Sequence, residues 1–200
     1  MMIRSLFTFA AFFLCAVAAT DISEVRAEVR IDIKTEYYTV RGRTVEALDD
    51  SISRNAPILN GDAQALGQAR LQFKSNVQGV TENGKCRVTN PGVDLAVVVV
   101  LPRWRDEKRS GQDLRLLWRS FSGYIAAHEA RHVEIARKHA ERLKRMFTRV
   151  PDAPTCDMLQ SRLEAGAKRI LSEHHREQLR FDEVEQRRMA RAIRRSLTRR

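Results

Sequence analysis

The sequence lacks the features that mark several large classes of protein. No apolar run of eighteen residues occurs within the chain, which argues against an integral membrane bundle. No repeat period is visible, and the 43% hydrophobic and 30% charged residues are typical of a folded globular chain rather than a collagen-like or fully disordered one. A length of 200 residues leaves room for one domain of ordinary size.

Acidic residues are missing from residues 187–200, which contain seven arginines. Most of the formal net charge of +11 therefore lies in this basic C-terminal tail, and the rest of the chain is only mildly basic. Because the charge is so distributed, no nucleic acid partner is expected. The tail is expected to be a solvated helix end or a disordered arm, and anionic membrane lipids or cell-surface polymers are the polyanions that it would contact.

Residues 1–27 have the pattern of a secretory signal peptide. Arg4 gives a positive start, residues 6–19 form an apolar stretch too short for a comfortable membrane span, and small residues suited to cleavage follow at Ala18 and Ala27. An uncleaved N-terminal anchor is the alternative. We therefore predict export to the periplasm or the cell exterior, and we assign residues 28–186 to the folded domain.

Export changes the interpretation of the three cysteines. Cys15 leaves with the signal peptide, and the sequence contains no C-x-x-C pair. The mature chain keeps Cys86 and Cys156, and an even pair in an oxidising compartment predicts one disulfide. The alternative is that both thiolates serve as metal ligands.

The first half of the mature chain has the pattern of β-strands. Apolar and polar residues alternate over residues 29–40 and again over residues 68–80, which is the period of a half-buried strand. Residues 83–84 read Asn-Gly, a hairpin turn signal. Residues 93–101 are strongly β-like, and Pro102 is expected to end that strand. These segments predict a small antiparallel sheet of three or four strands.

The second half of the mature chain has the pattern of helices. Residues 112–149 contain no proline and one glycine, and apolar residues recur there at helical spacing, which predicts one long helix or two in series up to Pro151. A second long helix is expected to begin near Cys156 or Asp157, and a short helix is expected over residues 44–53. The predicted fold class is therefore α+β, a small antiparallel β-sheet followed by two long packed helices.

One motif carries chemistry. Within the first long helix, His128-Glu129-Ala130-Arg131-His132 is H-E-x-x-H. Two histidines four residues apart lie on one face of a helix, so both imidazoles can bind one Zn²⁺. Glu129 would lie beside the metal without binding it and act as general base toward a zinc-bound water. The motif therefore predicts a zinc metallopeptidase with His128 and His132 as ligands and Glu129 as the catalytic residue.

The motif does not fix the third zinc ligand. The metzincin continuation would need a glycine and a histidine where Ile135 and Lys138 stand. His139 lies about 10 Å along the helix axis from His132, too far to share the ion. A ligand from the second long helix is geometrically better, and the candidates there are Glu164, His174, His175, Asp182 and Glu185. The alternative for the adjacent His174 and His175 is that both are solvated histidines on the helix surface.

Several short blocks occur in an order and spacing that extend over most of the mature chain. They are YYTV at residues 37–40, CRV at 86–88, LPRW at 101–104, Trp118, the H-E-x-x-H motif, Cys156-Asp157 and Phe181-Asp182. In these blocks the chain resembles a bacterial domain family of unknown function described as predicted secreted zinc-dependent proteases. The resemblance implies a zincin-like metallopeptidase in the periplasm or outside the cell.

The resemblance also bears on the third ligand. The family's last block is similar to Tyr-Asp-x-x-Thr-x-His-Gly, whereas residues 181–188 here read FDEVEQRR. The aspartate is kept as Asp182, and the threonine, histidine and glycine are absent. If the family's third ligand is the histidine, this chain has lost it; if it is the aspartate, Asp182 completes the site. On this basis we predict Asp182 as the third ligand.

Two functions from different classes follow from these patterns. The first is a secreted or periplasmic zinc-dependent metallopeptidase that hydrolyses peptide bonds of a peptide or protein substrate. The second is a non-catalytic exported protein with a structural metal site or a helical partner-binding role. The fourth coordination position separates them, because a water there favours catalysis and a fourth protein ligand favours a structural role.

Overall fold

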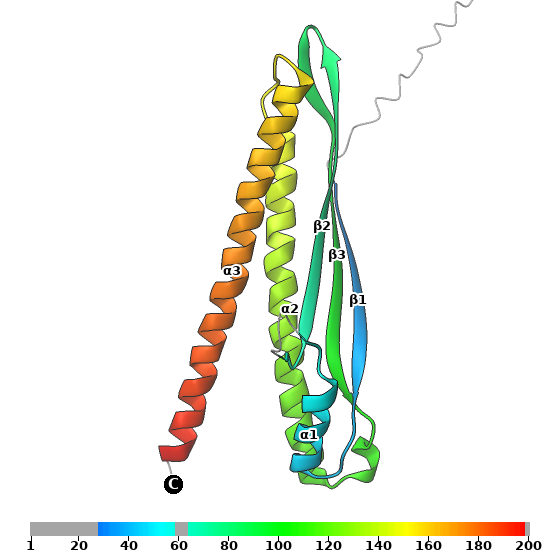
Figure 1. Cartoon of the computed structure of the whole chain (residues 1–200), viewed down its shortest axis with the longest axis vertical. Coiled ribbons are helices and arrows are strands. Elements are labelled where there is room, and N and C mark those ends of the chain that lie inside the picture. The colour runs from blue at the N-terminus through cyan, green and yellow to red at the C-terminus, as the bar shows by residue number, and fades with distance from the viewer. Residues whose placement is uncertain (1–27, 59–63, 199–200) are drawn as a thin grey trace, which may run out of the picture.

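The computed structural model describes residues 28–58 and 64–198, and the predicted signal peptide lies outside these residues. They form an α+β fold in which a three-stranded sheet and a short helix precede two long helices (Figure 1). No helix in these two ranges is both long enough and apolar enough to span a bilayer. The prediction of an α+β fold with two long helices is thus confirmed, and the sheet differs from the prediction in its strand directions.

The sheet is mixed rather than antiparallel, with the strand order β1-β3-β2. β1 (Glu28–Val40) pairs in parallel with β3 (Lys85–Trp104), and β2 (Gln68–Glu82) pairs with β3 in the antiparallel sense. The predicted turn joins β2 to β3, with φ values of 51° at Asn83 and 73° at Gly84, so these strands are antiparallel neighbours. The connection from β1 to β2 is long and contains a helix. It therefore allows β1 to reach the other edge of β3 and run parallel to it.

β3 continues through two prolines. We expected Pro102 to end this strand, but the strand extends to Trp104. β2 pairs with β3 only as far as Val100, and β1 pairs with it only from Gly92 onward, so Pro91 and Pro102 each lie where β3 has a single neighbour. Proline lacks one ladder N–H, and a position with one free edge tolerates that loss.

α1 (Val45–Asn55) follows β1 where a short helix was predicted over residues 44–53, and Thr44 caps its start. The Thr44 hydroxyl accepts a hydrogen bond from the backbone N–H of Ala47 at 3.2 Å, which satisfies one of the free donors of the first turn. The buried face of α1 closes one end of the sheet in a small apolar cluster that includes Leu48, Ile52, Trp104 and Trp118.

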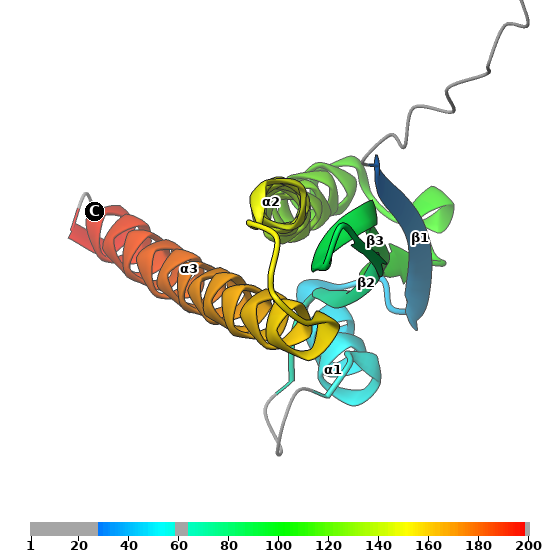
Figure 2. The same cartoon turned by 90° about the horizontal axis from the view of Figure 1, so that it is seen from above.

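α2 (Gln112–Arg149) follows a single 3-10 turn, η1 (Glu107–Arg109), and is one uninterrupted helix. It covers one face of the sheet, as Figures 1 and 2 show. A strand presents every second side chain to the same face, so β3 offers α2 a continuous apolar stripe. The two elements build the main core from Val93, Leu95, Val97 and Val99 of β3 and Val133, Ala136, Ala140, Leu143 and Phe147 of α2.

α3 (Cys156–Thr198) begins where the sequence predicted and runs back along α2. Near its start it packs against α2 and the sheet, and its C-terminal part diverges from α2 (Figures 1 and 2). The helix includes residues 187–198, so most of the predicted basic tail is a continuation of α3.

The predicted disulfide between Cys86 and Cys156 is present and joins β3 to the first residue of α3. Beside it, the backbones of Cys86 and Ala153 exchange two hydrogen bonds of 2.7 and 2.9 Å. These links fix the start of α3 against the sheet. They therefore limit how far α3 can slide along α2, and thus which residues of the two helices face each other.

Candidate metal centre

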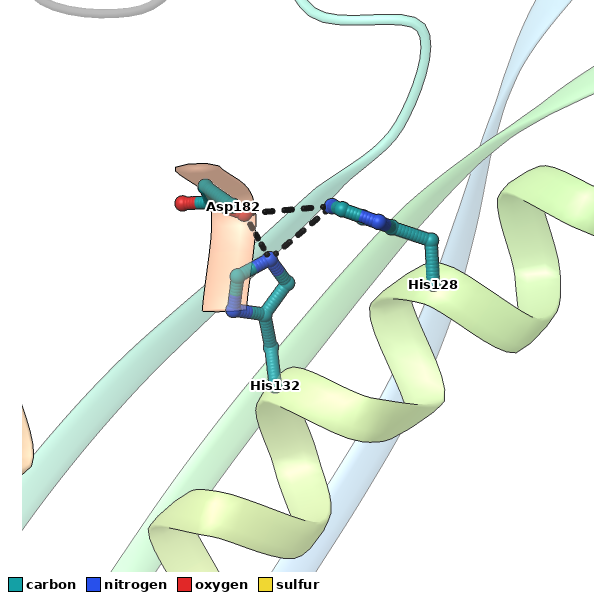
Figure 3. A group of neighbouring side chains, drawn as sticks. All are labelled: His128, His132 and Asp182. Carbon is teal, nitrogen blue, oxygen red and sulfur yellow. Dashed lines mark hydrogen bonds and ion pairs between the residues drawn. The ribbon is translucent and has the colours of Figure 1, made fainter. Parts of the chain in front are cut away.

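The two long helices bring together the three predicted ligands (Figure 3). His128 and His132 lie one turn apart on α2, and Asp182 approaches them from α3. Asp182 Oδ1 is 3.3 Å from His128 Nε2 and 3.0 Å from His132 Nε2, and the two Nε2 atoms are 3.1 Å apart. Among the residues that the structure describes, this is the one group of three or more candidate ligands with converging donor atoms.

The donor triangle has the dimensions of a zinc site. Ligands about 2.0–2.1 Å from a tetrahedral ion lie about 3.3 Å from one another. The three observed separations are 3.0, 3.1 and 3.3 Å. Without a metal ion or a shared proton, two imidazole lone pairs and a carboxylate oxygen would repel one another at these distances. Two imidazoles and a carboxylate are also donors that Zn²⁺ accepts, and three of them leave a fourth position for another ligand.

A buried glutamine on α3 orients His132. Gln178 is 8% exposed, and its amide Nε2 donates to the His132 carbonyl at 3.1 Å and to His174 Nε2 at 2.8 Å. Because both amide hydrogens are used, Gln178 Oε1 is the atom that faces His132 Nδ1, at 2.6 Å, and it accepts that N–H. The proton of neutral His132 therefore lies on Nδ1. Its Nε2 lone pair faces the donor triangle, as a metal ligand requires.

Phe181 packs against both histidines, with ring centroids 4.9 Å from His128 and 5.0 Å from His132. Burial lowers the pKa of His128, and His132 lowers it further, against the opposite effect of the Asp182 carboxylate. A lowered pKa favours the neutral imidazole, which is the form that binds a metal. The Nδ1 atom of His128 is buried and has no hydrogen-bond partner within the described ranges.

Glu129 lies on the same helix but contacts the start of β2. It is 4% exposed, and a Cβ on Gly67 would lie only 2.8 Å from Glu129 Oε1. Burial raises the pKa of Glu129 to about 7, although His132 and a hydrogen bond from the backbone of Ala69 act in the opposite direction. A carboxyl group with a pKa near 7 can take up and release a proton at neutral pH.

A groove of about 550 Å³ adjoins the donor triangle between α2, α3 and the residues before β2. The Tyr38 hydroxyl donates to the Leu66 carbonyl at 2.8 Å and so holds one wall of the groove in place. The wall residues are mainly apolar, with three acidic residues among them, and include Leu66, Tyr124, Ile125, Glu129, Asp182, Glu185 and Met189. The groove is therefore a place where an extended polypeptide could lie beside the donor triangle.

The remaining histidines lie outside the triangle. His139 is fully buried, and its Nε2 is 2.9 Å from Glu177 Oε2. His174 packs edge-on against Phe73 and His139, with ring centroids 5.0 and 5.4 Å away, so it is a half-buried residue of the α2–α3 interface rather than a solvated one. His175 is exposed.

The two glutamates considered as third ligands also lie outside the triangle. Glu164 accepts a hydrogen bond from Gln160 at 2.8 Å, near the other end of α3. Glu185 lines the groove and accepts a long hydrogen bond of 3.4 Å from the Tyr124 hydroxyl. Asp182 is therefore the candidate from α3 that the structure places beside both imidazoles.

Three residues that shape the site were not assigned a role from the sequence: Gly67, Gln178 and Phe181. Gln178 lies four residues after His174 and four before Asp182, so helical spacing could have placed it on the face that meets α2. Phe181 precedes Asp182 in the block quoted above. Nothing in the sequence near Gly67 points to Glu129, because that contact depends on how β2 meets α2.

Comparison with known proteins gives a family without an established function. The family model described as bacterial protein of unknown function (DUF922) matches residues 35–197, which include every residue of the donor triangle. No curated protein and no solved structure matches the chain.

Proposed function

The chain belongs to the bacterial family of unknown function DUF922, and from the chemistry of its α2–α3 site we propose that it is a zinc-dependent metallopeptidase of the periplasm or cell exterior. One observation carries the proposal. His128, His132 and Asp182 present donor atoms 3.0–3.3 Å apart, and the buried carboxyl group of Glu129 lies next to them beside a groove of about 550 Å³.

The three ligands would hold Zn²⁺, which when bound lowers the pKa of a water toward about 7 and polarises a peptide carbonyl. His132 is held in the required tautomer by Gln178. The buried Nδ1 of His128 leaves that ring only its Nε2 to offer at the triangle. Asp182 brings the negative charge that offsets part of the charge of a divalent ion.

Glu129 is proposed to handle the protons of the reaction. Its burial favours the protonated form more than in a solvated glutamate, so its carboxylate is a stronger base than usual. It would take a proton from the attacking water and give it to the nitrogen of the leaving amine. Gly67 leaves the space in which the carboxyl group sits, so a larger residue there would displace it.

The groove supports a polypeptide substrate rather than a small solute. It runs beside α3 from Asp182 to Ala190, and most of its wall is apolar, which matches the side chains of an extended peptide. Location outside the cytoplasm is supported by the signal pattern of residues 1–27 and by the disulfide, since disulfides persist in oxidising compartments.

The test compares hydrolysis with metal content. In zinc-loaded mature protein, Glu129→Gln should lower hydrolysis of a peptide library at least about 10²-fold, because general-base catalysis contributes about 10²–10⁴-fold. Zinc content should stay at about one ion per chain, because the three ligands are untouched. Glu134→Gln is the matched control, since this glutamate lies on the same helix with its side chain 66% exposed, and it should keep full activity.

Two outcomes would contradict the proposal. One is zinc-loaded parent protein that hydrolyses no member of the library. The other is a Glu129→Gln protein that cleaves as fast as the parent. Retention of zinc in the first case would leave the non-catalytic protein with a structural metal site as the better interpretation, and the second outcome would exclude Glu129 as the general base.

A further inference from the structure

Four arginines surround a second groove at the end of the α2–α3 hairpin that lies away from the donor triangle. The groove has a volume of about 610 Å³ and lies between the last turns of α2 and the first turns of α3. Arg145 and Arg149 come from α2, and Arg162 and Arg169 come from α3. The 17 residues from His132 to Arg149 correspond to roughly 25 Å along α2, so this groove is separate from the proposed metal centre.

The positive charge of this groove is not neutralised locally. No carboxylate lines it, and none of the four arginines forms an ion pair within residues 28–58 and 64–198. Arg169 helps to lower the pKa of Glu173, but the Glu173 carboxylate is hydrogen-bonded to Arg142. Like charges one turn apart on a helix repel, so the folded chain keeps an unfavourable cluster here that an anion would relieve.

The groove is partly preorganised. The guanidinium group of Arg162 donates to the Asp152 carbonyl at 3.2 Å and more weakly to the Pro151 carbonyl at 3.5 Å, so its position is fixed by the interhelical turn. A Cβ on Gly166 would lie 2.9 Å from Met146 Sδ, and this close packing defines the distance between the two helices at the groove. An arginine held in place loses less freedom when its planar group binds a phosphate.

The same end of the molecule also exposes apolar side chains. The tip of the β2–β3 hairpin and the start of α3 lie together there (Figure 1), joined by the disulfide between Cys86 and Cys156. Val80 is 43% exposed and Met158 is 46% exposed. The groove itself has apolar side chains from Met146 and Val150 between its arginines. Exposed apolar residues beside a cluster of arginines match a surface that has phosphates above hydrocarbon.

We propose that this end of the molecule docks on an anionic phospholipid surface, with Arg145, Arg149 and Arg162 binding lipid phosphates around the groove. Arginine suits this partner because its guanidinium fork makes paired hydrogen bonds to phosphate oxygens. Val80 and Met158 would rest on the interface beside them. In this docking the donor triangle lies roughly 25 Å along α2 from the residues that contact the membrane.

The experiment measures binding of the full mature chain to vesicles. Sedimentation with vesicles of phosphatidylcholine and phosphatidylglycerol is compared with vesicles of phosphatidylcholine alone, at low and physiological salt. The groove variant is Arg145→Gln/Arg149→Gln/Arg162→Gln. The control variant is Arg41→Gln/Arg105→Gln/Arg137→Gln, which removes the same charge from three exposed arginines outside the groove. Circular dichroism verifies that both variants fold.

The groove variant should lose about fivefold in affinity for the anionic vesicles per arginine removed, or roughly 10²-fold in all, and the control should lose much less. Changing the same three arginines to lysine keeps the charge but not the fork, and should give an intermediate loss. Equal losses in the groove and control variants would overturn the proposal, since net charge alone would then explain binding. A second result would also overturn it: the groove variant binds vesicles as tightly as the parent, while inorganic phosphate stabilises the parent, but not that variant, against heat. The groove would then hold a free anion.

Discussion

Gln178 offers the sharpest test of how the chain prepares a metal site. Its three polar contacts are to the carbonyl of His132, to Nδ1 of His132 and to Nε2 of His174. Gln178→Leu removes all three and leaves an apolar side chain that is one atom shorter. His132 then has no acceptor that selects the Nδ1–H tautomer, so part of the population presents a proton rather than a lone pair to the metal.

The expected magnitudes follow from these contacts. Loss of the partner that orients a metal-bound histidine typically lowers metal affinity about 10–100-fold. The metal-free protein should also be destabilised by about 1–3 kcal/mol, because the Nδ1–H of His132 loses its acceptor and Nε2 of His174 loses its donor. Gln178→Glu separates the two effects. Its carboxylate still accepts from His132 Nδ1, so zinc affinity should stay near that of the parent, while the lost amide donor still lowers stability.

The assay is a competition for Zn²⁺ between the protein and a chromophoric chelator, together with urea unfolding of the metal-free protein. Gln160→Leu serves as a control, because it removes an exposed glutamine from the same helix whose one hydrogen bond is to Glu164. If folded Gln178→Leu protein binds zinc as tightly as the parent, the idea that this glutamine sets the tautomer of His132 is wrong.

Three further predictions concern the site and its supports. Asp182→Ala should abolish tight zinc binding without unfolding the chain, and unchanged zinc affinity by the same chelator competition would exclude this residue as a ligand. Reduction of the disulfide between β3 and α3, whose cysteines are 70 residues apart, should lower the free energy of unfolding by about 4 kcal/mol, and no change in the urea midpoint would contradict this. Hydrogen bonds from Lys138 and His139 lower the pKa of Glu177 to about 2, so its stabilising effect is complete above about pH 4.5 and is lost as the pH falls toward 2. Because the Lys138–Glu177 pair is partly exposed, we expect this effect to contribute roughly 1 kcal/mol to the free energy of unfolding. It is measured as a smaller loss of stability for Glu177→Gln than for the parent when the pH falls from 5 to 3.

Local patterns in the sequence were enough to predict the helices and to place His128 and His132 of the candidate site on one helix face. The spacing of His128 and His132 places both rings on one side of a helix, because an α-helix repeats every 3.6 residues whatever it packs against. The absence of proline from residues 112–149 predicted that this helix would be long, and it is one helix. The disulfide followed from the count of cysteines left in the mature chain and needed no knowledge of the fold.

The strand directions could not be obtained in the same way. Alternation of apolar and polar residues identifies β1 and β2 but is the same for parallel and antiparallel pairing. The direction of β1 depended on the long connection that carries it across β3 to the other edge. Pro91 and Pro102 are compatible with β3 because each faces only one neighbouring strand. This can be known only when the pairing of all three strands is known.

The rest of the candidate site was decided by tertiary structure for the same reason. The position of Asp182 against both histidines depends on where α3 meets α2, which the packing of the two helices and the link between Cys86 and Cys156 determine. Neither the tautomer of His132 nor the burial of Glu129 is visible in the H-E-x-x-H motif, since both come from residues on other elements. The sequence by itself determined which side chains could bind and react, because that depends on residue type and helical period. The tertiary structure decided which of them meet and in what state of protonation, because that depends on burial and on contacts between elements far apart in the chain.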